Sequence, residues 1–205
     1  MRILFTRHGE SHANLQRIIS NRSLPHPLTP KGIDQAAVLA DHLVKDAHLS
    51  IIISSPIPRA IQTATIIAKR VSLPFTANDA LREFDCGAME GRSDQDAWLA
   101  HQTIVRAWDE DQDYDRFIPP DGESFNDQKA RFIPFLLDLI SDHRSLDGDI
   151  LMVSHGALLH QMLPLFLSNI NREFTKQHPL GNCQLVITFP ENNQLKCISW
   201  NDISV

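Results

Sequence analysis

Apolar residues form two kinds of segment, and the two kinds alternate along the chain. Residues 2–6, 50–54 and 149–153 are short and apolar almost throughout, which is typical of strands covered on both faces. Longer segments between them carry apolar residues at helical spacing. The first of these contains Ile33, Ala36, Ala37, Ala40, Leu43 and Val44. Strands that alternate with helices predict an α/β fold, here a three-layer αβα sandwich with a mostly parallel mixed sheet.

Local signals indicate where the helices begin. Thr29 and Pro30 are typical of a helix N-terminus, because threonine caps the first turn and proline fits the first helical position. Ser124 is predicted to cap a long helix, which Pro134 should kink or divide. The other predicted helices cover about Ile57 to Val71, residues 93–108 and a segment that begins near Gly156.

The C-terminal part has the pattern of an antiparallel hairpin. Residues 183–189 and 194–200 alternate between apolar and polar around Glu191-Asn192-Asn193. Residues 7–28 and 74–92 lack such periodicity and are expected to be irregular.

The length of 205 residues fits one domain, so we expect a single domain over 1–205. Residues 84–120, with the acidic stretch Asp109 to Asp115, are expected to form an insertion over one end of the sheet.

Composition excludes several functional classes. The chain has 19 Lys and Arg against 25 Asp and Glu, a formal net charge of -6. This excludes proteins that coat nucleic acid or anionic lipid through bulk charge. No segment approaches the ~18 consecutive apolar residues of a membrane span. Because Met1 leads directly into the first strand, we expect a cytoplasmic protein with neither nucleic acid nor membrane as partner.

The cysteines favour a reducing compartment. Cys86, Cys183 and Cys197 show no CxxC spacing, and their odd number does not indicate a disulfide framework. Cys183 and Cys197 could face each other across the predicted hairpin, but we favour two half-buried thiols.

Basic side chains follow all three predicted inner strands. Residues 2–6 are followed by Arg7-His8-Gly9, residues 50–54 by a helix that carries Arg59, and residues 149–153 by Ser154-His155-Gly156. Ligands of open α/β sheets bind outside the carboxyl ends of the strands. We therefore expect Arg7, His8, Arg59 and His155 to converge on one anion.

Two guanidinium groups and two imidazoles suit a phosphoryl group. Arginine engages phosphate oxygens with a planar fork, and a histidine nitrogen can act as the nucleophile. Such a site needs no metal if the cations stabilise the transferring group, so we expect no cofactor. A leaving alkoxide needs a proton, for which Glu83 is the candidate donor. The neighbouring Asp85 and Glu90 remain alternatives.

These motifs resemble, in order, those of the histidine phosphatase superfamily, also called phosphoglycerate mutase-like. The matching segments are Arg7-His8-Gly9-Glu10-Ser11, LTPKGIDQA at 28–36, SSPIPRAIQTA at 54–64, LREFDCGAMEG at 81–91, DGESF at 121–125 and VSHG at 153–156. The resemblance implies that His8 becomes phosphohistidine, and that Arg7, Arg59 and His155 bind and polarise the phosphoryl group. It further implies that Glu83 is the acid and base, and that the Asn14 side chain donates to the phosphate.

Other polar residues are predicted to be structural. His12 follows His8 by four residues, a zinc-like spacing, but it falls in a loop without an evident third ligand, so no metal site is expected. His160 is expected to point away from His155 on its helix.

Within this family the residues favour a phosphatase over a mutase. A mutase needs additional basic groups after the catalytic glutamate, and here Arg92, Arg106 and Arg116 lie among many acids. The alternatives are a mutase, an inactive phosphate-binding module and a phosphatase of protein phosphohistidine. Glu83 favours alkyl phosphoesters, whose leaving groups benefit from protonation.

Substrate specificity is expected to come from residues 17–27, 84–118 and 174–182. We predict an apolar wall there, which would suit a small-molecule phosphate monoester with a bulky organic group. The overall pattern resembles the α-ribazole and broad-specificity phosphatases. The predicted wall consists of Phe84, Met89, Trp98 and Trp108.

The C-terminal hairpin could pair with the edge strand of a second copy, which would form a homodimer.

Overall fold

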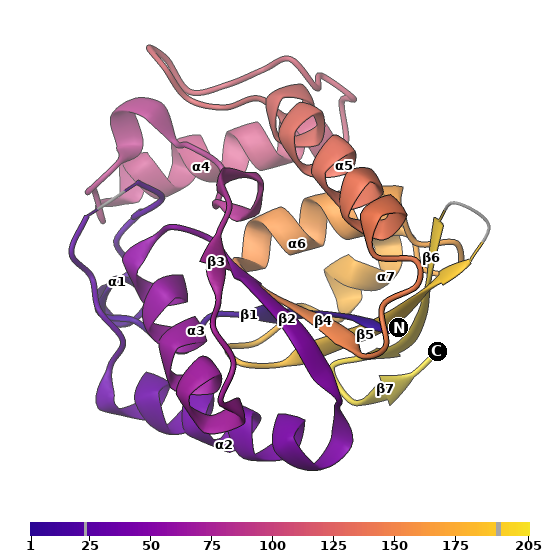
Figure 1. Ribbon diagram of the computed structural model, residues 1–205. Coiled ribbons are helices and arrows are strands. Elements are labelled where there is room, and N and C mark those ends of the chain that lie inside the picture. The colour runs from indigo at the N-terminus through magenta and orange to yellow at the C-terminus, as the bar shows by residue number, and fades with distance from the viewer. Residues whose placement is uncertain (23, 192–193) are drawn as a thin grey trace.

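A seven-stranded sheet runs through the molecule in the order β3-β2-β4-β1-β5-β6-β7. The computed structural model describes residues 1–22, 24–191 and 194–205 (Figure 1). The strands are β1 (Ile3–Arg7), β2 (Leu49–Ser54), β3 (Thr76–Ala77), β4 (Asp149–Ser154), β5 (Leu185–Glu191), β6 (Gln194–Trp200) and β7 (Ile203–Ser204). Strands β3, β2, β4 and β1 are parallel, whereas β5, β6 and β7 pair antiparallel. This mixed sheet confirms the predicted fold class.

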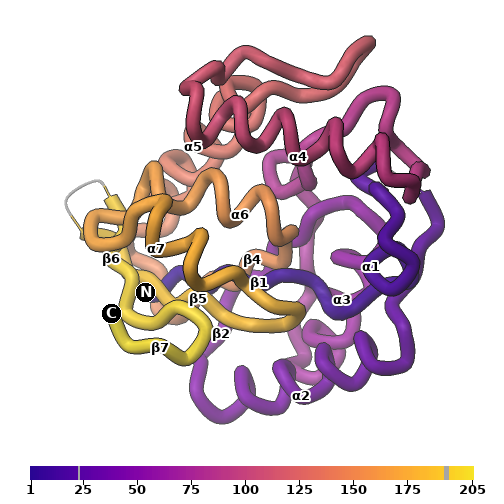
Figure 2. The backbone as a smooth tube through the Cα atoms, turned by 180° about the vertical axis from the view of Figure 1, so that it is seen from behind, coloured from indigo at the N-terminus to yellow at the C-terminus, as the bar shows by residue number. Residues whose placement is uncertain are grey.

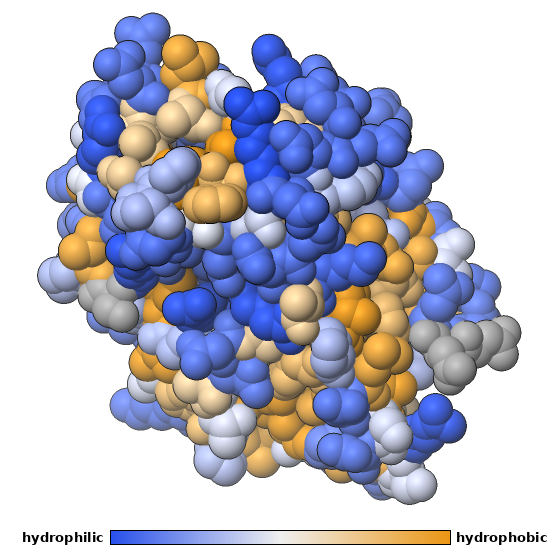
Figure 3. Space-filling view, turned by 90° about the horizontal axis from the view of Figure 1, so that it is seen from above, coloured by the Kyte–Doolittle hydropathy of each residue, from blue (hydrophilic) through white to orange (hydrophobic). Residues whose placement is uncertain are grey.

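Helices cover both faces of the sheet. They are α1 (His12–Gln16), α2 (Pro30–Asp46), α3 (Pro58–Val71), α4 (Gln95–Asp109), α5 (Phe125–Asp142), α6 (Gly156–Met162) and α7 (Arg172–Gln177). Helix α2 lies on the opposite side of the sheet from α4, α5 and α6 in both views (Figures 1 and 2). Seen from above, the surface is largely hydrophilic, with apolar residues in separate patches (Figure 3).

Alternation along the inner strands divides the core in two. Leu4 and Leu151 belong to the apolar cluster with α2 and α3, whereas Phe5 and Met152 belong to the cluster with α5 and α6. Successive side chains of a strand point to opposite faces, so each inner strand serves both clusters. All four residues are at most 2% exposed, as expected of a sheet covered on both sides.

The N-termini of the helices agree with their sequence signals. The Thr29 hydroxyl accepts a hydrogen bond from the Gly32 amide at 3.0 Å, and Pro30 opens α2. Ser124 caps α5, and the Asp127 side chain accepts from the Ser124 amide in return. Helix α5 passes through Pro134 as one element, so the helix is not divided there.

Several local expectations were wrong. Residues 7–28 contain the short helix α1, and residues 74–92 contain β3 and 3₁₀ turns at Asp79–Leu81 and Gly87–Met89. In α2, Ile33 and Val44 are 48% and 46% exposed, while Leu39 packs in the core. The buried face of α2 consists of Gly32, Ala36, Leu39, Ala40 and Leu43, so Ile33 and Val44 lie at its edge.

The C-terminal hairpin is confirmed. Strands β5 and β6 pair antiparallel from Val186–Trp200 to Glu191–Gln194, and the turn predicted at 192–193 lies outside the described residues. Cys183 precedes β5, whereas Cys197 pairs with Thr188 inside the hairpin. Both are free thiols, so the alternative of a disulfide is wrong.

Candidate active site

The carboxyl ends of the inner strands meet as predicted. Arg7 is in register with Ser154, and Ser54 is in register with Val153. The His8 amide donates to the Ser154 carbonyl at 3.0 Å, which continues the pairing of β1 and β4 by one residue. Chain segments that are far apart in the sequence therefore place Arg7, His8 and His155 at one edge of the sheet.

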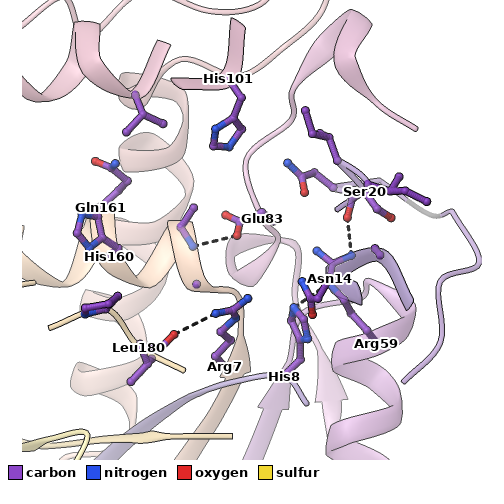
Figure 4. Close-up of a pocket in the computed structure, with 18 of the residues that line it drawn as sticks. Arg7, His8, Asn14, Ser20, Arg59, Glu83, His101, His160, Gln161 and Leu180 are labelled. Carbon is purple, nitrogen blue, oxygen red and sulfur yellow. Dashed lines mark hydrogen bonds between the residues drawn. The ribbon is translucent and has the colours of Figure 1, made fainter. Parts of the chain in front are cut away.

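Arg59, at the start of α3, connects the two histidines. Its Nε donates to His8 Nε2 at 2.8 Å, and its Nη2 donates to His155 Nδ1 at 3.2 Å. Nη1 donates to the carbonyl of Ser20 (Figure 4). Arg59 is 5% exposed, and burial lowers its pKa to about 10, so the guanidinium remains charged near neutrality.

These contacts define the protonation of both imidazoles. His8 Nδ1 lies 2.7 Å from the Gly9 carbonyl, which only accepts, so Nδ1 carries the proton and Nε2 has the free electron pair. His155 accepts at Nδ1, so its Nε2 donates to Ser55 Oγ at 2.7 Å. Burial, followed by the charge of Arg59, lowers the pKa of both residues well below the usual value, which favours neutral rings.

Arg7 presents a second cation, whose side chain is partly buried. Its Nη1 donates to the Leu180 carbonyl at 3.1 Å, while its buried Nε has no partner among the described residues. A buried donor without an acceptor is costly, so this guanidinium is suited to receive an anion. A Cβ at Gly156 would lie 3.2 Å from Arg7 Nε, so glycine leaves room for the side chain.

Glu83 is held at the N-terminus of α6. Its carboxylate accepts from the amides of Ala157 at 3.0 Å and Leu158 at 2.8 Å. Burial nevertheless raises its pKa, because the cost of removing the charge from water exceeds the effect of these donors. Arg131 on α5 donates to the carbonyls of Ala80 and Arg82, which fixes the segment that carries Glu83.

The two alternative acids have other contacts. Glu90 accepts from the amides of Asn21 and Arg22, which holds that loop in place. Asp85 pairs with the Arg22 guanidinium at 2.6 Å. Among the described residues that line the pocket, Glu83 is the only carboxylate.

Asn14 also lines the pocket, from the short helix α1. Its Oδ1 accepts from the Ser11 amide at 3.1 Å as part of a capping box. This contact turns the amide oxygen toward the helix end and leaves the NH₂ group for the pocket. Asn14 lies beside His8 and Arg59 in the close-up (Figure 4).

These residues occupy one end of a cavity of about 400 Å³. The other end has apolar walls and three polar side chains. His101 on α4 lies in the range 84–118 that was predicted to set specificity, whereas His160 and Gln161 on α6 were not predicted to face a ligand. His160 and Gln161 lie across the cavity from Asn14 and Ser20 (Figure 4). The apolar lining is Ala13, Ile18, Ile19, Trp98, Val105, Ala157, Pro179 and Leu180.

The predicted wall and the prediction for His160 need correction. Phe84 and Trp108 are 1% and 0% exposed and belong to the core, since their rings pack edge to face 5.1 Å apart. Met89 is half-buried against the core and does not line the cavity, whereas Trp98 does. His160 faces the cavity as well, because α6 runs along its wall.

His155 also has a different place from the one expected. It is fully buried beside His8, with ring centroids 5.1 Å apart, and is not among the residues that line the cavity. Its contact with the site runs through Arg59. The partner Ser55 was missed as a site residue, although its position beside Ser54 at a strand end was a usable signal.

The described residues form neither a metal site nor a membrane-spanning helix. In the described ranges, no group of three or more His, Cys, Asp or Glu side chains is placed to hold a metal ion. His12 begins α1. None of the helices in the described part of the chain is long and apolar enough to cross a membrane.

Comparison with known proteins agrees with this geometry. A putative alpha-ribazole-5'-P phosphatase from Escherichia coli K-12 superposes with a TM-score of 0.79 at 25% identity, covering 98% of this chain and 96% of that one. A 2,3-bisphosphoglycerate-dependent phosphoglycerate mutase of Cytophaga hutchinsonii is 30% identical over 178 residues, 83% of this chain and 79% of its own length.

A bifunctional protein of Mycobacterium tuberculosis is 31% identical over 166 residues, 81% of this chain. The match spans only 44% of that protein's length. The family model of the histidine phosphatase superfamily (branch 1) matches residues 3–203, nearly the whole chain. The motifs at the three strand ends thus have the setting that the resemblance predicted, and the chain belongs to the histidine phosphatase superfamily.

Proposed function

We propose that this protein is a metal-independent phosphomonoesterase that hydrolyses a small organic phosphate through a phosphohistidine intermediate. The observation that carries the proposal is the environment of His8. Its Nδ1 proton is committed to the Gly9 carbonyl, and its Nε2 lone pair faces the buried guanidinium of Arg59. A neutral, oriented imidazole beside fixed cations is the arrangement that nucleophilic attack on a phosphoryl group requires.

In the first step the phosphoryl oxygens take up donors of Arg7, Arg59 and Asn14. Arg59 Nε then donates to phosphate instead of His8, which frees the Nε2 lone pair. Nε2 bonds to phosphorus as the bond to the ester oxygen breaks, and Glu83 gives its proton to that oxygen. The raised pKa of Glu83 favours the protonated form that this step uses.

In the second step the Glu83 carboxylate takes a proton from water. The resulting hydroxide bonds to phosphorus, the bond to Nε2 breaks, and inorganic phosphate leaves. Neutral His8 and protonated Glu83 are restored. His155, held by Ser55, is proposed to fix the position of Arg59 throughout, in place of a direct role on the phosphate.

Two functions compete with this proposal: a mutase and an inactive phosphate-binding module. The cavity lining favours hydrolysis, since Arg7 and Arg59 are its only Arg or Lys side chains among the described residues. A mutase needs further cations for a carboxylate and a second phosphate. We also propose that the chain forms a single functional domain in which residues 84–120 lie over the site. We further propose a homodimer and a cytoplasmic location.

The test is phosphate release from p-nitrophenyl phosphate and alkyl phosphomonoesters in EDTA, for the wild type and His8→Ala. We expect release by the wild type and a loss of at least ~10³-fold in His8→Ala, because the nucleophile is gone. Acid-labile labelling by ³²P-labelled substrate should disappear in the same variant. A requirement for added divalent metal, or labelling that survives the substitution, would contradict the proposal.

A further inference from the structure

The end of the cavity away from His8 has a defined chemistry. Trp98 and Val105 of α4 and Leu180 of the segment after α7 contribute apolar wall. His101, His160 and Gln161 add polar groups to the same region (Figure 4). His8 lines the same cavity, so a leaving group attached to a phosphate at His8 would extend toward these residues.

This end carries no fixed positive charge on its described lining residues. Burial lowers the pKa of His101 to about 4, and it also lowers the pKa of His160, so both rings are neutral at pH 7. Three cations near this end are not among its lining residues. Arg172 and Lys176 both pair with Asp109, and exposed Arg17 lies over the Trp98 ring.

Gln161 is oriented by a network that spans three helices. Its side chain is 1% exposed, and its Oε1 accepts from Nη2 of Arg172 on α7. The same Nη2 donates to Asp109 at the end of α4. Because Arg172 only donates, the amide oxygen must face it, and the Gln161 NH₂ group remains to donate to a ligand in the cavity.

We propose that the substrate is the phosphate ester of an uncharged alcohol, one of whose oxygens accepts a hydrogen bond from Gln161 Nε2. Arg172 is then a positioning residue that sets the direction of this donor. An anionic leaving group would lie against apolar walls and neutral imidazoles, and none of the described residues that line this end would supply a cation to pair with it, which is unfavourable. This inference rests on the proposed hydrolysis at His8 and adds the class of leaving group.

A matched series of three substrates tests the charge preference. Benzyl phosphate, 4-(hydroxymethyl)benzyl phosphate and 4-carboxybenzyl phosphate share a primary leaving oxygen and differ in one distant group. We expect kcat/KM for the carboxylate to be at least about tenfold below that for the hydroxymethyl compound, because its charge is left unpaired. Equal or faster turnover of the carboxylate would overturn the inference.

Variants of Gln161 test the donor. Gln161→Glu keeps an oxygen for Arg172 but loses the NH₂ group, and Gln161→Leu loses both. We expect each to reduce the hydroxymethyl-to-benzyl ratio of kcat/KM by about fivefold, the value of one hydrogen bond. Arg172→Met should change the ratio in the same direction. Gln102→Leu, on the exposed side of α4, is the matched control and should leave it unchanged.

The outcomes separate the two proposals. If benzyl phosphate is not hydrolysed, or is hydrolysed equally by His8→Ala, the proposed function is wrong. If hydrolysis depends on His8 but the Gln161 variants slow all three substrates alike, the proposed function stands and the role of Gln161 is wrong. The charge preference is read from the wild type alone, so it is decided even if a variant fails to fold.

Discussion

At the scale of single residues, opposing effects on one group decide the chemistry of the site. Three backbone amides donate to Glu83 and lower its pKa, yet burial raises it more. The raised pKa favours the protonated carboxyl, which is the form that the proposed first step uses. His8 shows the reverse case, since burial and two neighbouring guanidinium groups keep its ring neutral and nucleophilic.

We predict that Glu83→Gln slows alkyl phosphates much more than p-nitrophenyl phosphate. Removing a general acid costs on the order of 10²–10⁴-fold, and p-nitrophenolate needs little protonation, so its loss should stay below about tenfold. The wild-type rate on alkyl esters should fall as pH rises through the raised pKa of Glu83, because the acid must be protonated.

The measurement is kcat against pH for both substrate types, with Glu90→Gln as the matched control. Glu90 holds the loop at Asn21 and lies outside the cavity lining. Equal losses on alkyl and aryl esters in Glu83→Gln would assign the proton transfer to another group.

At the scale of elements, hydrogen bonds and ion pairs of the helices hold the walls of the site in place. Trp98 of α4 donates from its indole nitrogen to the Arg17 carbonyl at 2.7 Å, which ties α4 to the chain after α1. At the other end of α4, Asp109 pairs with Arg172 on α7. Helix α5 supports the opposite side through Arg131, so the stability of α5 bears on the position of Glu83.

We predict that Ser124→Ala lowers the free energy of unfolding by about 1 kcal/mol, the usual value of a helix N-cap. Ser124 is 4% exposed and forms a capping box with Asp127, so its loss leaves amides of the first turn without a partner. Urea unfolding measures the effect. Ser124→Thr keeps the hydroxyl and should recover most of the stability; a loss as large as that of alanine would contradict the capping explanation.

At the scale of the whole molecule, buried histidines make stability depend on pH. Burial lowers the pKa of His8, His101, His155 and His160 in the folded protein. In the unfolded chain they titrate near the ordinary value of about 6.5. Below that pH the unfolded state binds protons that the folded state does not. The free energy of unfolding therefore decreases as the pH is lowered.

We therefore predict a lower free energy of unfolding at pH 5 than at pH 7.5. The loss should begin near pH 6.5 and, for His101, continue to about pH 4. Glu83 acts in the opposite sense, because its raised pKa adds stability as it takes up a proton. Urea unfolding at both pH values gives the difference, which His101→Phe should reduce. An unchanged difference in that variant would show that His101 does not contribute.

The inner strands, most of the helices and the residues that gather at the strand ends could all be predicted from the amino-acid order alone. Short apolar strands must be covered on both faces, and parallel strands bring their carboxyl ends to one edge. Arg7, His8 and Arg59 could be placed together for that reason. Their motifs also predicted the family, which the match over residues 3–203 confirms.

Which side chains face the cavity and which are covered depends on contacts between distant parts of the fold. Phe84, Trp98 and Trp108 were all predicted to form the apolar wall. Only Trp98 lines the cavity, because Phe84 and Trp108 are buried in the core. His160 faces the site because α6 follows its wall, and the orientation of Gln161 depends on a contact with α7. Such contacts join elements distant along the chain, so no local pattern determines them.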